Sequence, residues 1–158
     1  MCLSPEIDIA AAVVTGVIAV DTLRRNENRD AALLAAIPAV FTVHNLASAL
    51  MWWGLLGEVS QSIAGPASTF YMLIAFVLWP AYVPLALRSM ESHRLRRRAL
   101  ELVWVLGLVN AGWHLWRLVH GQMEPVAHEH YVSFEYPSDP ALVGPLYGLA
   151  TSAATLLS

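Results

Sequence analysis

The sequence contains no lysine, one cysteine and few charged residues of any kind. Only 13% of its 158 residues are charged, whereas 57% are hydrophobic, and a typical soluble domain is about 25% charged. We therefore do not expect a soluble globular enzyme. Nucleic-acid binding is disfavoured because twelve carboxylates outnumber nine arginines. The single cysteine, Cys2, excludes an internal disulfide framework.

Long apolar stretches are abundant, and five of them are long enough to cross a bilayer. The hydrocarbon core is about 30 Å thick and needs about 20 residues of helix. We predict an all-α fold, an integral membrane helical bundle of about five transmembrane helices that forms a single domain over residues 1–158. The expected bounds are 7–23, 31–56, 67–87, 99–119 and 140–157, with a long outer loop at 121–137.

The positions of the arginines predict the orientation. Eight of the nine follow the first or the third apolar stretch, and positively charged loops of membrane proteins face the cytoplasm. The N-terminus is then outside and the C-terminus inside. These eight are Arg24, Arg25, Arg29, Arg88, Arg94, Arg96, Arg97 and Arg98.

The second apolar stretch carries polar residues at membrane depth, where they are costly and usually mark a ligand site, a pathway or an ion pair. His44 lies about 13 residues into the stretch, near the bilayer midplane at 1.5 Å per residue. Ser48 and Trp52 follow on the same helix face, and Asn45 adjoins them. A histidine that only bonds to a neighbouring helix is the alternative for His44.

The fourth stretch carries a longer polar stripe. Asn110, His114 and Arg117 recur at the spacing of one helix face. Asp8 is expected in the first outer turn of the first helix. These residues are candidates for a pocket in the outer half of the membrane.

The outer loop adds further histidines. If it is extended, His128 and His130 point the same way, and such a pair can chelate a late first-row cation. His120 precedes them and Glu124 lies between. Ordinary loop residues are the alternative interpretation.

Cys2 has its own chemistry. Removal of the initiator Met leaves a free amine beside the thiol, and that pair can chelate a metal or act as a nucleophile. If Met1 stays, Cys2 is a small interfacial residue or a lipidation site.

Several segments resemble an uncharacterised bacterial family of small multi-pass membrane proteins, a domain of unknown function that begins Met-Cys-Phe-Ser. The matching segments are Met1-Cys2-Leu3-Ser4, Met51-Trp52-Trp53-Gly54-Leu55, Ala75-Phe76-Val77-Leu78-Trp79-Pro80 and Val83-Pro84-Leu85. Leu3 departs from the family's Phe, and His44 and Ser48 stand where the family commonly has Gln and Glu. The resemblance implies a bacterial cytoplasmic (inner) membrane and a role for Cys2, but no activity.

The leading hypothesis is a metal-binding membrane enzyme that acts on a lipid or another apolar small molecule. Zinc would suit hydrolysis, and copper or iron would suit redox chemistry. The expected metal ligands are drawn from His44, His114, His120, His128, His130 and Cys2. The expected catalytic residues are His114, Asp8, Cys2 and Arg117. The expected substrate pocket consists of Asn45, Ser48, Trp52, Asn110 and Glu124.

Two alternatives stay open. The same polar residues can form a metal-free site for acid–base catalysis, or a proton relay or transporter built from several subunits, because imidazoles transfer protons near neutral pH. The chain can also be a non-catalytic accessory or scaffold subunit. Gly144, Gly148 and Ser152 form a small-residue face that would pack a homo-oligomer in that case.

Overall fold

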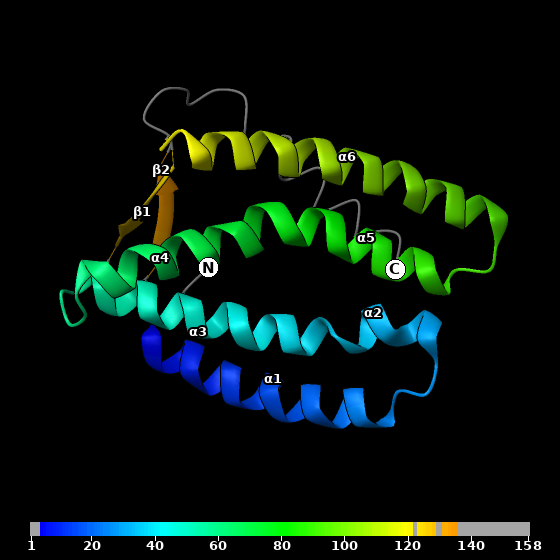
Figure 1. Cartoon of the computed structure of the whole chain (residues 1–158), viewed down its shortest axis with the longest axis horizontal. Helices are drawn as coiled ribbons and strands as arrows, with labels where there is room; N and C mark the ends of the chain where they lie inside the picture. Colours follow the sequence, from blue (N-terminus) through cyan, green and yellow to red (C-terminus); the bar gives the residue numbers. More distant parts are fainter. Residues whose placement is uncertain (1–3, 122, 129–130, 136–158) are drawn as a thin grey trace.

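Four helical rods lie side by side in chain order, with a short β-hairpin at one end (Figure 1). This computed structural model describes residues 4–121, 123–128 and 131–135. Each rod packs against the one before it: α1 against α3, α3 against α4, and α5 against α6. The predicted helical fold is confirmed for most of the described chain.

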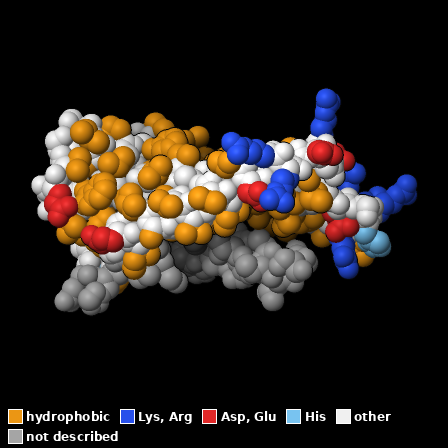
Figure 2. All heavy atoms as spheres, turned by 90° about the horizontal axis from the view of Figure 1, so that it is seen from below, with side chains coloured by type: hydrophobic (Ala, Val, Ile, Leu, Met, Phe, Trp, Pro, Cys, Tyr) orange, Lys and Arg blue, Asp and Glu red, His pale blue; other side chains and the backbone are white. Residues whose placement is uncertain are grey.

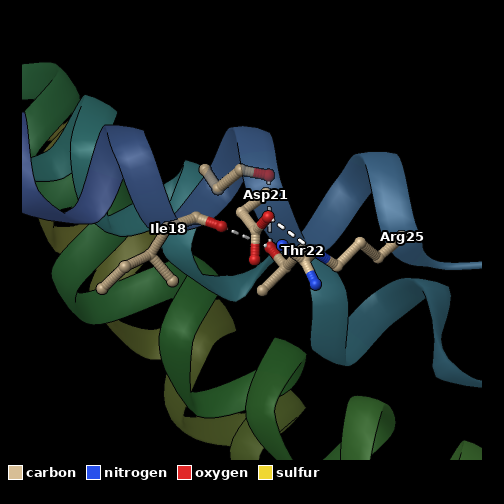
Figure 3. A network of polar contacts seen from close by, with 5 residues as sticks. Ile18, Asp21, Thr22 and Arg25 are labelled. Carbon is tan, nitrogen blue, oxygen red and sulfur yellow. Dashed lines mark hydrogen bonds and ion pairs between the residues drawn. The ribbon is translucent and has the colours of Figure 1, made fainter.

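The first rod is α1 (Pro5–Arg25). The Ser4 hydroxyl caps it by accepting a hydrogen bond from the Ile7 N–H at 3.3 Å, and proline suits the first helical position. Thr22 donates to the Ile18 carbonyl in its own helix and, at 3.1 Å, to Ala35 in the next rod (Figure 3). Thr42 also reaches α1, donating to Thr15 at 3.0 Å.

The second rod was expected as one helix over 31–56 and instead has a break. It consists of η1 (Arg29–Ala31), α2 (Ala32–Ala35) and α3 (Ile37–Leu55). The break falls at Ala36, where Pro38 has no N–H to donate to the Leu34 carbonyl four residues earlier.

A tight turn joins the second rod to the third. Gly57 has a φ of 78°, and the Glu58 N–H donates to Trp53 while the Gly57 N–H donates to Gly54. This is the Schellman arrangement that ends helices at glycine. The interval 57–66 between the second and third predicted helices is therefore too long, since the next helix begins at Gln61.

The third rod is longer than the predicted 67–87 and contains a wider turn. It is built from α4 (Gln61–Met72), the π-helical segment η2 (Leu73–Leu78) and α5 (Trp79–Met90). The Trp79 N–H donates to Ile74, five residues back. Pro80 lies directly after this turn and supplies no N–H to it, a known cause of local helix irregularity.

The fourth rod, α6 (Arg94–Val119), begins five residues before the predicted 99–119. Arg94, Arg96, Arg97 and Arg98 therefore belong to its first turns and not to a loop. The predicted bounds covered only the apolar part of the helix. Arginine is also a good helix former, so the helix includes the arginines that precede the apolar part. α6 approaches α5 closely at Gly107, where an added Cβ would lie 2.0 Å from the Pro80 carbonyl oxygen.

The outer loop is not wholly irregular, which corrects the all-α prediction in this region. β1 (Glu124–Ala127) and β2 (Val132–Glu135) form an antiparallel hairpin in which Pro125 is opposite Phe134. The strands are too short for alternating hydrophobicity to reveal them, and no Asn-Gly or Asp-Gly turn separates them.

Within the residues that the structure describes, three helices are long and apolar enough to cross a membrane: Arg29–Leu55, Gln61–Met90 and Arg94–Val119. α1 is more polar, since every 18-residue window of it contains at least three charged residues. Figure 2 shows hydrophobic side chains over much of the visible surface, with arginines gathered toward one end. The predicted fifth helix, 140–157, lies outside the described residues.

Candidate functional site

The main hydrophobic core lies at the hairpin end of the rods. Met51 and Trp52 from α3 meet Tyr71 and Met72 from the third rod, and the hairpin region closes over them with Met123 and Val132. The hairpin is therefore part of the core.

The buried polar side chains of the described chain lie at this same end. Asp8 is 8% exposed, Ser48 1%, His114 1% and Arg117 3%. They come from α1, α3 and α6, so three rods that are distant in sequence contribute. We call these four, together with His44, Trp52 and Asn110, the hairpin-end site.

Asp8 and Ser48 form its first part. The Ser48 hydroxyl donates to the Asp8 carboxylate at 2.5 Å across the α1–α3 interface. The sequence had assigned Asp8 to catalysis and Ser48 to the substrate pocket. The structure pairs the two, and this bond gives a buried carboxyl group a partner.

A chain of stacked rings forms the second part. His44 stacks on Tyr71 with ring centroids 4.3 Å apart, and Tyr71 stacks on Phe134 at 5.5 Å. Phe134 meets Phe76 edge-on at 5.2 Å, and Phe76 contacts His114 at 5.1 Å. The two helical histidines therefore lie at opposite ends of three aromatic rings.

Arg117 lies one turn beyond His114 on α6. Its guanidinium lies over the Trp113 ring, 5.1 Å from the centroid. Such a cation–π contact favours a buried guanidinium, since the ring face is electron-rich.

Three polar atoms of the site have no hydrogen-bond partner within the described structure. They are His44 Nδ1, Trp52 Nε1 and Asn110 Nδ2, and each is buried. A buried polar atom without a partner costs about 1–3 kcal/mol. In native structures such atoms usually have a partner in the protein or in an ordered water.

The remaining predicted metal ligands lie elsewhere. His120 contacts the Trp116 carbonyl with Nδ1 at 2.7 Å, and His128 contacts the Ser133 hydroxyl with Nε2 at 2.8 Å. Cys2 and His130 lie outside the described residues. Among the residues that are described, no three His, Cys, Asp or Glu side chains are grouped so that they could hold a metal ion.

Two predicted pocket residues are peripheral. Glu124 is exposed on the hairpin, and Asn45 is half-buried beside His44. Conversely, sequence reasoning missed Tyr71, Phe76 and Phe134. Tyr71 and Phe76 do not have the spacing of one α-helical face, because the π-helical turn begins between them. Phe134 reaches the core only because the hairpin folds against the rods.

A separate apolar groove of about 690 Å³ lies between α3, η2 and α6. Val43, Ile74 and Ala111 are among its lining residues. None of the seven residues of the hairpin-end site lines it.

These features define a class of protein: a mostly helical chain with three helices long and apolar enough to cross a membrane, and with polar side chains buried between the rods at one end. The chain belongs to the family of unknown function DUF6629, whose family model matches residues 1–158. The resemblance to an uncharacterised domain family is thus confirmed. No curated protein and no solved structure matches the chain.

Proposed function

We propose that this is a multi-pass protein of the bacterial inner membrane that binds a lipid or another apolar small molecule through a polar group at the hairpin-end site. The observation that carries this proposal is the set of partnerless buried atoms His44 Nδ1, Trp52 Nε1 and Asn110 Nδ2. A ligand that offers hydrogen-bonding groups would give them partners, as the few polar groups of an apolar pocket usually do.

The proposed chemistry is acid–base and needs no metal. His44 and His114 are the groups suited to transfer protons. Asp8, held by Ser48, would place a carboxyl group near the outer ends of α1 and α3. Three aromatic rings between the two histidines favour separate roles for them over shared coordination of one ion.

Entry to the site depends on the hairpin in this proposal. Phe134 lies between Tyr71 and Phe76, so a ligand ring or chain that reaches both histidines has to displace it. The hairpin has only two short strands, and such a unit is held mainly by its packing.

The test uses apolar substitutions, each of which removes one of the three buried atoms that have no partner. They are Trp52→Phe, His44→Phe and Asn110→Leu, with His93→Gln as the control, because His93 is exposed at the opposite end. Molecules retained through mild-detergent purification are counted by native mass spectrometry. We expect wild type and the control to retain a bound molecule and the three variants to lose it.

Ligand-free stability supplies the second readout. In His44→Phe and Asn110→Leu, removing a buried atom without a partner should stabilise the empty protein by about 1 kcal/mol or more. Trp52→Phe also leaves a cavity in the core, which offsets this gain. Weaker retention together with a higher melting temperature is therefore the expected combination for His44→Phe and Asn110→Leu. Full retention in all three variants would overturn the proposed site.

The metal-binding alternative is tested by elemental analysis of the purified protein. It needs Cys2 or His130 to complete a ligand set. Stoichiometric zinc, copper or iron in purified protein, lost in His114→Ala, would replace the metal-free proposal with the metal-binding one.

A further inference from the structure

The end of the molecule opposite the hairpin carries eight of the nine arginines of the sequence. The loop between α1 and η1 and the connection between α5 and α6 are far apart in sequence but are joined by a hydrogen bond. The Ser89 hydroxyl donates to the Asp30 carbonyl at 2.7 Å. Nearby, the Tyr82 hydroxyl donates to the Leu33 carbonyl at 2.6 Å. We call this end the arginine surface: Arg24, Arg25, Arg29, Arg88, Arg94, Arg96, Arg97 and Arg98.

Carboxylates within the protein neutralise only part of this surface. Arg25 pairs with Asp21 at 2.6 Å, and Arg88 pairs with Glu101 at 2.9 Å, with Arg97 4.0 Å from the same Glu101. The other five have no ion pair within the described residues, namely Arg24, Arg29, Arg94, Arg96 and Arg98.

Three of these five occupy an unfavourable position. Arg94, Arg96 and Arg98 lie in the first turns of α6, where the helix dipole favours negative charge and opposes cations. They are exposed, so their charge is available to a partner. Their placement therefore reduces the stability of the isolated helix and suits an anion supplied from outside.

The neighbouring surface is apolar. Leu95 is 72% exposed beside these arginines, and Leu102 is 69% exposed two turns further along α6. A basic surface that passes directly into exposed leucines matches the boundary between lipid headgroups and acyl chains.

We propose that the arginine surface binds the phosphate groups of anionic phospholipids. Guanidinium groups pair with phosphate oxygens through two parallel hydrogen bonds, and the exposed leucines contact the attached acyl chains. The proposal rests on the membrane placement alone and does not depend on a ligand at the hairpin-end site.

The test measures lipid binding by delipidated full-length protein in neutral detergent, with phosphatidylglycerol, phosphatidylcholine or inorganic phosphate as the probe. We expect clear binding of phosphatidylglycerol and much weaker binding of the other two. The triple variant R94Q/R96Q/R98Q should bind phosphatidylglycerol at least about tenfold more weakly, since each basic residue near the surface contributes a several-fold gain in affinity. The charge-preserving R94K/R96K/R98K variant should lose less affinity than the Gln variant, since lysine keeps the charge but cannot form the two parallel hydrogen bonds.

Melting temperature in the same detergent distinguishes binding from folding. The Gln variant should melt at the wild-type temperature or above it, because it removes charges that oppose the helix dipole. If the triple variant does not fold, Arg96→Gln alone should weaken binding about threefold. Equal binding of the two lipids, binding of inorganic phosphate as tight as that of phosphatidylglycerol, or undiminished affinity in the Gln variant overturns the proposal. The hairpin-end variants should leave this affinity unchanged, so the two proposals can fail separately.

Discussion

At the scale of single residues, the Asp8–Ser48 hydrogen bond shows how a membrane-type helix pair retains a carboxyl group in its interior. The hydroxyl of Ser48 is the donor, and both side chains are less than a tenth exposed. Serine is small enough to let α1 and α3 approach each other and still supplies a hydrogen-bond donor. Alanine would allow the same approach but would remove the donor.

Ser48→Ala should therefore destabilise the protein by about 1–3 kcal/mol, because Asp8 would lose its donor. Thermal unfolding in detergent measures the change. Ser68→Ala is the matched control, since Ser68 bonds only to the Ala64 carbonyl of its own helix. Equal effects of the two substitutions would contradict a special role for the Asp8–Ser48 bond.

The sequence predicted which polar residues lie together where those residues share one helix face. His44, Ser48 and Trp52 were expected together on one face, as were Asn110, His114 and Arg117, and all six have side-chain atoms buried at the hairpin end. What each residue contacts was not predictable. Distances between rods decide that Ser48 faces Asp8 and that His44 faces Tyr71, and no local pattern encodes such distances.

At the scale of elements, glycine permits a close approach of two rods. The Pro80 carbonyl lacks the N–H that residue 84 would supply in a regular helix, because that residue is Pro84. Gly107 of α6 packs directly over this carbonyl. A Cα–H contact to such an oxygen is a recurring feature of helix interfaces.

Gly107→Ala should destabilise the protein by about 3 kcal/mol, since its Cβ would lie 2.0 Å from a backbone oxygen and α6 would have to shift. Gly112→Ala on the same helix meets nothing within 4 Å. It should stabilise by about 0.5–1 kcal/mol through helix propensity. Chemical or thermal denaturation of both variants checks the opposite signs, and a stable Gly107→Ala would show that the two rods can separate without cost.

The hairpin is the element that the sequence predicted least well, and its Phe134 stacks on Tyr71 and meets Phe76 of the third rod. Phe134→Ala should destabilise by about 2 kcal/mol, somewhat less than a fully buried phenylalanine. Under the proposed function it should also speed ligand release, measured by dilution of ligand-loaded protein. Tyr131→Ala is the control, because Tyr131 is half exposed and stacks only on His128 among the described rings. Unchanged release in Phe134→Ala would argue against the hairpin as the cover of the site.

The sequence predicted helix boundaries only where a boundary coincides with a change in hydrophobicity. The apolar runs located each described rod, but the helices extend beyond those runs at Gln61 and Arg94. Hydrophobicity measures contact with lipid or core, whereas helix ends depend on capping and backbone hydrogen bonds. The break at Ala36 and the π-helical turn at Leu73–Leu78 both lie near prolines that the sequence displays, yet their form depends on neighbouring rods.

At the scale of the whole molecule, charge and polarity separate along the rods. The arginine surface occupies one end, and the hairpin-end site occupies the other.

The proposed orientation places the arginine surface in the cytoplasm. A membrane-impermeant maleimide tests this with single cysteines in a Cys2→Ala background. Ser60→Cys, exposed beside the turn after α3, should react in intact cells, and Ser92→Cys, exposed between α5 and α6, only after permeabilisation. The reverse pattern would invert the proposed topology.

The π-helical turn has a consequence for comparing members of the family. A turn closed by hydrogen bonds five residues apart holds one more residue than an α-helical turn. Deleting one residue between Leu73 and Leu78 would therefore give a regular helix while Tyr71 and Pro84 keep their directions relative to the other rods. A one-residue gap at this place in an alignment would mark members whose third helix is regular, with the same neighbours on either side.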